Sequence, residues 1–115
     1  MALSEFEIKR VEKAIDGYIQ AHRPPPHMRN ELDLAFRLSE QSVVIYEIRP
    51  DWNSPSQKME SPIAKATYAK NQNIWKIYWM RADLKWHSYP PAPRVKTIEE
   101  FLALVEKDEH ACFFG

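Results

Sequence analysis

The stretch Asn73-Ile-Trp-Lys-Ile-Tyr-Trp-Met-Arg81 decides the fold that this sequence predicts. Side chains alternate between the two faces of a β-strand, so the residues of this stretch divide into two sets. Trp75, Ile77 and Trp79 form an apolar set that fits a buried core, whereas the lysine and tyrosine between them form a polar set that fits a surface. The stretch therefore predicts a strand with one buried face and one open face.

The residues before this stretch predict its partner strand. Residues 63–70 follow Pro62 and also alternate, and Asn71-Gln72 can form a tight turn because asparagine tolerates the left-handed conformation. Such a turn pairs Tyr68 with Trp75, Thr67 with Lys76, Ala66 with Ile77 and Ala64 with Trp79. The alanines leave room for the large side chains opposite them, so we expect these two strands to form the middle of an antiparallel sheet.

Two more strands are predicted upstream, at residues 31–38 and 43–49. The loop between them decides which side chains share a face, because a shift of one residue turns every side chain over. A two-residue loop would put Glu47 and Arg49 on the core side, where unpaired charges are costly. We therefore expect a three-residue loop made of Glu40-Gln41-Ser42.

Helices are predicted at both ends of the chain. Ser4 and Glu7 have the spacing of a capping box, and the helix that they begin must end before Pro24. Thr97 and Glu100 repeat the capping pattern at the start of a second helix.

These elements together predict an α+β fold. A short edge segment at residues 85–89 precedes the second helix, so the sheet has four to five strands in an antiparallel β-meander. The N-terminal and C-terminal helices both cover the apolar face of this sheet. We expect residues 1–115 to form a single domain.

The composition excludes several functional classes. Sixteen basic and sixteen acidic side chains give a net charge of zero, which argues against a dedicated binder of duplex DNA. The only glycines, Gly17 and Gly115, cannot form a glycine-rich phosphate loop or a dinucleotide-binding motif. Histidine and cysteine do not occur with the spacing of a zinc site, so we expect no metal and no cofactor.

The compartment is predicted from the single cysteine and from the absence of apolar runs. Cys112 has no partner for a disulfide within the chain and suits a reducing compartment. The first residues contain no secretion signal, and no apolar run approaches the ~20 residues of a membrane-spanning helix. We expect a cytoplasmic protein with no membrane contact, whose apolar tail at residues 110–115 packs against the domain.

The open face of the predicted sheet is the first candidate site. Its candidate ligand-binding residues are Arg49, Lys65, Lys76 and Tyr78. Cations that contact phosphates and aromatic rings that stack on bases are typical of proteins that hold single-stranded nucleic acid. The three-residue loop places Tyr46 in the core and Asp33 opposite Arg49, so Asp33 and Glu47 counter the positive charge of this face. A solvated face with weak cross-strand ion pairs is the alternative.

Two tryptophans in proline-containing loops are the second candidate site. Trp52 follows Pro50, and Trp86 lies close to Pro90. Exposed aromatic residues of this kind anchor protein interfaces, so the partner would be another protein or a second copy in a homodimer. With either ligand, single-stranded nucleic acid or protein, we expect a non-enzymatic binding module.

The alternative is a Mg²⁺-dependent nuclease or phosphodiesterase. Asp33 on one strand and Glu47 on its neighbour could hold Mg²⁺, and Arg49 lies where such nucleases carry a lysine. Arg49 cannot release a proton near neutral pH, so it could stabilise a phosphate but could not act as a base.

Seven segments carry a resemblance to a known family. They are residues 4–7, 23–27, 47–50, 64–68, 75–87, 97–101 and 112–113, of which 75–87 reads Trp-Lys-Ile-Tyr-Trp-Met-Arg-Ala-Asp-Leu-Lys-Trp-His. The chain resembles the short bacterial proteins grouped as domain of unknown function 3024. The resemblance implies a bacterial single-domain protein and assigns no catalytic residues.

Overall fold

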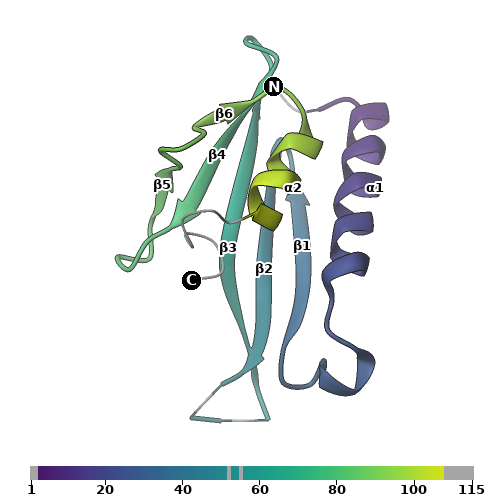
Figure 1. Cartoon of the computed structure of the whole chain (residues 1–115), viewed down its shortest axis with the longest axis vertical. Coiled ribbons are helices and arrows are strands. Elements are labelled where there is room, and N and C mark those ends of the chain that lie inside the picture. Colours follow the sequence, from purple (N-terminus) through teal and green to yellow (C-terminus); the bar gives the residue numbers. More distant parts are fainter. Residues whose placement is uncertain (1–2, 52, 55, 108–115) are drawn as a thin grey trace.

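The computed structural model describes residues 3–51, 53–54 and 56–107. Two helices and an antiparallel sheet form an α+β fold, as predicted (Figure 1). The elements are α1 (Glu5–His22), the 3-10 turn η1 (Pro26–Met28), β1 (Asp33–Ser39), β2 (Ser42–Pro50), β3 (Lys58–Ala69), β4 (Ile74–Met80), β5 (Trp86–Ser88), β6 (Arg94–Val95) and α2 (Ile98–Lys107). The strands follow the order β1-β2-β3-β4-β5, and β6 also pairs with β4. The predictions for Trp52 and for the tail at 110–115 lie outside the described residues.

The pairing of β3 with β4 is confirmed. The structure pairs Tyr68 with Trp75, Thr67 with Lys76, Ala66 with Ile77 and Ala64 with Trp79. Both alanines and Ile77 are fully buried. The turn is longer than predicted, because β3 ends at Ala69 and β4 begins at Ile74, and Asn73 rather than Asn71 adopts the left-handed conformation with φ of 54°.

The predicted loop between β1 and β2 is wrong. Ser39 pairs with Ser42, so the turn has two residues, and Glu40 adopts the left-handed conformation with φ of 52°. This shorter turn moves Val43 into the core, where it is fully buried, and moves Tyr46 to the open face. Asp33 consequently pairs with Ile48 and not with Arg49.

The physical reason for this error lies with Glu47. The prediction assumed that Glu47 and Arg49 would be unpaired charges if they were placed on the helix side of the sheet. They bond each other instead, since Arg49 donates to the Glu47 carboxylate at 3.1 Å, and the guanidinium stays largely in solvent. The penalty for unpaired charge therefore does not arise, and the two-residue turn is preferred.

A β-bulge shifts the register of the β2–β3 pairing by one residue. Ile45 pairs with Ala64, but the next residue, Tyr46, pairs with Pro62, which leaves Ile63 as the extra residue. Both Ile63 and Ala64 are therefore buried. The bulge also accommodates Pro62, which has no N–H to give to the ladder.

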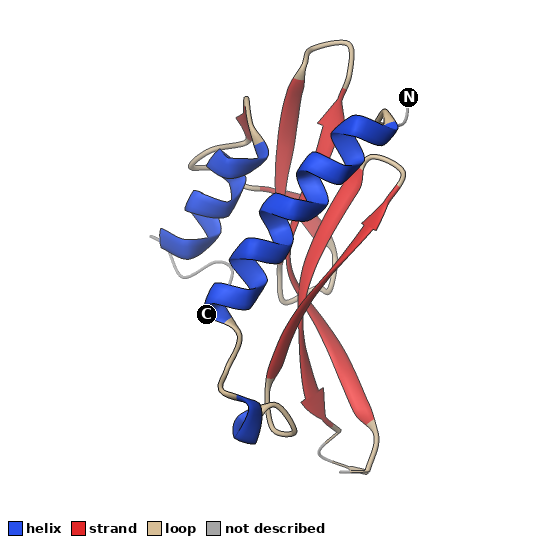
Figure 2. Ribbon diagram, turned by 90° about the vertical axis from the view of Figure 1, so that its right-hand side faces the viewer, coloured by secondary structure: helices blue, strands red, loops and turns tan. Residues whose placement is uncertain are grey.

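The two helices lie on the same side of the sheet, as predicted (Figure 2). Ser4 and Glu7 form the expected capping box at the start of α1, and Arg23 ends this helix before Pro24 with extended backbone. The Thr97 hydroxyl accepts a hydrogen bond from the N–H of Glu100 at the start of α2. No helix in the described ranges is long and apolar enough to cross a membrane.

The outer edge of β4 is covered by two short strands that follow each other along it. β5 pairs with Tyr78–Met80, and β6, which the sequence did not predict, pairs with Trp75 and Lys76. Tyr89, between them, donates its N–H to the Ile77 carbonyl and is almost completely buried.

The close fit of β3 against β4 predicts the effect of an enlarged side chain. Ala66→Leu adds volume at a position with no accessible surface, so we expect a loss of about 1–3 kcal/mol in the free energy of unfolding. Urea denaturation followed by tryptophan fluorescence measures it. Ala82→Leu, at an exposed position, is the matched control and should change stability by less than about 0.5 kcal/mol. Equal effects of the two substitutions would contradict the close packing of β3 on β4.

Candidate functional site

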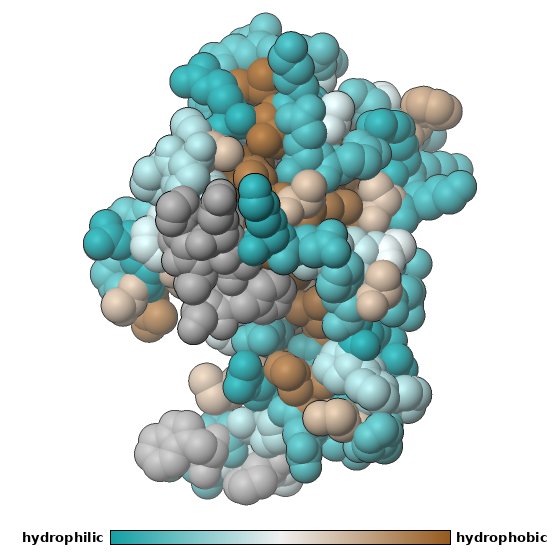
Figure 3. Space-filling view, in the orientation of Figure 1, coloured by the Kyte–Doolittle hydropathy of each residue, from teal (hydrophilic) through white to brown (hydrophobic). Residues whose placement is uncertain are grey.

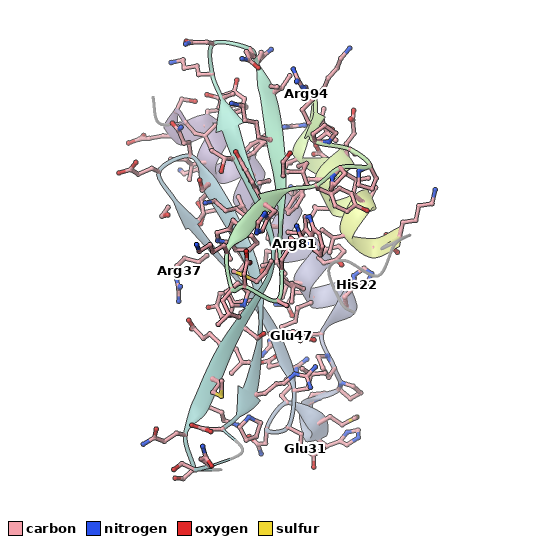
Figure 4. The ribbon with its side chains drawn as sticks, turned by 90° about the vertical axis from the view of Figure 1, so that its left-hand side faces the viewer. His22, Glu31, Arg37, Glu47, Arg81 and Arg94 are labelled. Carbon is pink, nitrogen blue, oxygen red and sulfur yellow. The ribbon has the colours of Figure 1, made fainter. Side chains whose placement is uncertain are left out.

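The face of the sheet opposite the helices carries cations and aromatic rings. We call it the open face, and its defining residues are Arg37, Tyr46, Lys65, Thr67, Lys76, Tyr78 and Trp86. They come from five strands, because the registers of the sheet bring them to the same side. Arg37 projects from the side of the sheet away from α2 (Figure 4).

Lys65 occupies the middle of the open face. Its Nζ atom lies 5.6 Å from the centre of the Tyr78 ring and 5.7 Å from the centre of the Trp86 ring. Both distances are within the range of cation–π attraction, so the half-buried Lys65 side chain contacts two half-buried aromatic residues. Three residues that the sequence predicted for ligand binding are thereby brought together.

A second cation–ring pair lies next to this cluster, towards β1. The guanidinium of Arg37 lies 5.1 Å from the centre of the Tyr46 ring. Arg37 also donates to both carboxylate oxygens of Glu60, at 3.1 and 3.2 Å, and this bonding raises its pKa. The arginine therefore remains charged and is oriented across the open face.

Lys76 extends the positive charge towards β6. It pairs with Arg94 across the β4–β6 ladder and is exposed. A hollow of about 250 Å³ lies here, lined by Gln72, Lys76, Tyr78, Ser88, Pro93 and Arg94.

Three of the residues on or beside the open face were missed as site residues by the sequence reasoning. Arg37 was not among the ligand-binding residues predicted for this face. Tyr46 was assigned to the core, because the three-residue loop was preferred. Arg94 was missed because a two-residue strand such as β6 carries no alternation signal. A two-residue turn at Glu40-Gln41 was the signal that would have found Tyr46.

Arg49, which was also predicted for ligand binding, lies apart from the open face. It shares the helix side of the sheet with Glu47, whose side chain is only 16% exposed. Trp52 lies outside the described residues.

The catalytic candidates Asp33 and Glu47 line a common cavity on the helix side. This cavity of about 240 Å³ is lined by Tyr18, His22, Pro24, Leu32, Asp33, Leu34, Glu47 and Glu106. Apolar residues are visible between polar ones down the middle of this side (Figure 3). Within residues 3–107 as described, no group of three or more histidine, cysteine, aspartate or glutamate side chains is placed to hold a metal ion.

Asp33 is bonded to the end of α1. Arg23 donates from Nε and Nη2 to the two carboxylate oxygens, both at 2.7 Å, and the N–H of Leu34 donates to the same carboxylate at 2.8 Å. The hydrogen bonds from Arg23 are the main cause of the lowered pKa of Asp33. This bidentate pair joins the helix to the first residue of β1.

The family model described as Domain of unknown function (DUF3024) matches residues 3–115. The chain belongs to this family. No curated protein and no solved structure matches the chain. The DUF3024 match spans every residue of the open face and of the helix-side cavity.

The lowered pKa of Asp33 predicts a pH-dependent contribution to stability. Asp33→Asn removes a carboxylate that is charged in both states at pH 7, and we expect a loss of about 1 kcal/mol after allowing for screening by solvent. The carboxylate favours the folded state above its unfolded pKa of ~3.9, and this benefit disappears as the pH falls through the lowered pKa of the folded state.

Denaturation of the wild type and of Asp33→Asn between about pH 7 and pH 2 measures the contribution of Asp33 to stability. Asp16→Asn, an exposed position on α1, is the control and should follow the wild-type curve. A difference between wild type and Asp33→Asn that persists at the lowest pH would argue against the ion pair as its cause.

Proposed function

We propose that the open face binds single-stranded nucleic acid and that the protein is a non-enzymatic binding module of the bacterial cytoplasm. The observation that carries this proposal is the position of Lys65 within cation–π distance of both the Tyr78 ring and the Trp86 ring. Arg37, on β1, is a second cation next to an aromatic ring, that of Tyr46, and lies two strands from Lys65 on β3.

The dimensions of the open face suit a few nucleotides. Tyr46 lies on β2 and Trp86 on β5, so three inter-strand steps of ~4.8 Å, or about 14 Å, separate their strands. Sheet proteins that bind RNA stack two or three bases on aromatic side chains across such a distance. Rings that accept any base, together with cations that contact phosphates, give binding with little sequence preference.

The corrected register of β1 and β2 supports a positive open face. Glu47 is on the helix side, and the charge of Asp33 is compensated by Arg23. Glu60 remains, but it is engaged by Arg37. The zero net charge of the chain is therefore distributed unevenly, which favours an anionic ligand on this side.

Binding is preferred over magnesium-dependent hydrolysis because of the partners of the two carboxylates. Asp33 is bonded by Arg23 and Glu47 by Arg49, so a metal ion would have to displace two arginines. The nuclease built on Asp33, Glu47 and Arg49 stays a prediction. A protein ligand for Trp52 and Trp86 is the other alternative.

The salt dependence of binding tests the proposal. A labelled single-stranded oligonucleotide is titrated with the protein, and fluorescence anisotropy gives the affinity at about 50 and 200 mM salt. Contacts from Lys65, Lys76 and Arg94 to about three phosphates predict a log–log slope near −2.1, or an affinity that is about 18-fold lower at the higher salt concentration. Arg37 is not counted, because it already bonds Glu60. No binding at the lower concentration would overturn the proposal.

Two substitutions separate the roles of charge and stacking. Tyr78→Ala should weaken binding by about 1–3 kcal/mol with little change in the salt slope, because it removes an aromatic ring and no charge. Lys65→Gln should reduce the magnitude of the slope by about 0.7.

Lys13→Gln, on the exposed surface of α1, is the matched control and should leave both the affinity and the salt slope unchanged. An equal effect of Lys13→Gln and Lys65→Gln would place the binding surface elsewhere. Circular dichroism of each variant checks that the fold is retained.

A further inference from the structure

The two edges of the sheet are built in different ways. The β4 edge is covered by β5 and β6, and Pro90, Pro91 and Pro93 interrupt the chain between and beside them. Prolines and very short strands prevent another chain from pairing with a sheet. β1, at the opposite edge, has seven residues without a proline or a bulge, and among the described strands it pairs only with β2.

The backbone groups that β1 leaves unpaired follow from the ladder. The Gln41 carbonyl accepts a hydrogen bond from the N–H of Tyr68, so Gln41 faces β3, and alternate residues of β2 face β3 and β1. Val44 and Tyr46 therefore face β1, where they pair with Arg37 and Ala35. The residues of β1 between these positions, Leu34, Phe36 and Leu38, turn their N–H and C=O groups outward. The Leu34 N–H already donates to the Asp33 carboxylate, so a partner strand can bond the Leu34 carbonyl and both backbone groups of Phe36 and Leu38.

Space lies beside this edge. A hollow of about 380 Å³ lies between α1 and β1, and its lining includes Asp16 and Gln20 of α1 and Ala35 and Phe36 of β1. Phe36 and Leu38 pack against the core but remain only half-buried. The edge thus combines unpaired backbone groups with incompletely buried apolar side chains.

We propose that β1 pairs antiparallel with β1 of a second copy about a two-fold axis at Phe36. Phe36 then lies opposite the partner's Phe36, and Leu34 lies opposite the partner's Leu38. The closely spaced pairs exchange about four backbone hydrogen bonds, because the Leu34 N–H of each copy is already bonded to Asp33. The apolar side chains of both copies meet on the helix side, where they complete each other's burial.

The sequence of β1 favours a second copy as the occupant because the strand is complementary to itself. On the open face the pairing places Arg37 opposite the partner's Ala35, so no like charges are opposed. The strand has charged residues only at Asp33 and Arg37, and each already has a partner in its own chain. The isologous contact matches the commonest symmetry of homo-oligomers.

The dimer would also extend the open face. The Arg37–Tyr46 pair lies on the two strands nearest the axis, so the pairs of both copies become neighbours. The inference about the dimer does not depend on nucleic-acid binding. A monomer that binds an oligonucleotide would overturn the dimer alone, and a dimer that does not bind would overturn the proposed function alone.

Charged substitutions at Ala35 test the pairing of β1 with the partner's β1. This half-buried residue of the open face lies outside the core, so charged substitutions should preserve the fold. Ala35→Arg would oppose the partner's Arg37 at two symmetric positions and should weaken the dimer about tenfold. Ala35→Glu at the same positions should strengthen it about tenfold.

Sedimentation equilibrium from roughly 5 to 200 µM distinguishes 13.6 kDa for one chain from twice that mass for the dimer. Ala82→Arg, at an exposed turn, is the matched control and should behave as the wild type. Amide hydrogen exchange supplies a second measurement, because the Phe36 N–H should be protected in the wild-type dimer and exposed in Ala35→Arg. A monomeric wild type throughout this range would overturn the proposal, and so would a dimer whose strength does not respond to either substitution at Ala35.

Discussion

The two-residue turn at Glu40-Gln41 is the constraint on which the rest of the molecule depends. Pairing Ser39 with Ser42 assigns every side chain of β1 and β2 to a face, because side chains alternate along both strands. It buries Val43 and Ile45 beneath the helices and turns Tyr46 to the other side. One residue more in this loop would exchange the two faces, and neither the core nor the open face would exist in its present form.

The sequence predicts structure well where packing and propensity agree. The register of β3 and β4 follows from the alternation of residues 73–81 and from the size match of Ala64 and Ala66 with the side chains opposite. The hairpin of β1 and β2 could not be predicted in this way, because two free-energy terms competed. The preference for a two-residue turn opposed the cost of placing Glu47 and Arg49 on the helix side. The cost assigned to Glu47 and Arg49 as buried charges was too high, since the pair lies near the end of β2 and Arg49 remains in solvent.

The candidate site, like the fold, could be predicted from the sequence only in part. Lys65, Tyr78 and Trp86 were predicted from the sequence, and their grouping depends on the β3–β4–β5 registers. The Arg37–Tyr46 pair could not be predicted, because its location depends on the turn at Glu40-Gln41. An error in one loop therefore removed one of the three cation–ring pairs of the open face from the predicted site and left Asp33 and Glu47 in its place.

The unequal edges of the sheet also limit what the protein can assemble into. A sheet with two free edges can add strands without end, whereas a sheet with one free edge closes after a single pairing. Here the prolines around β5 and β6 block one edge, and β1 leaves the other available. The proposed pairing through β1 would keep both sets of helices on one side, so the aromatic and cationic side chains would remain together on the other. In the proposed dimer, the same registers that create the open face would double it without growth into a fibre.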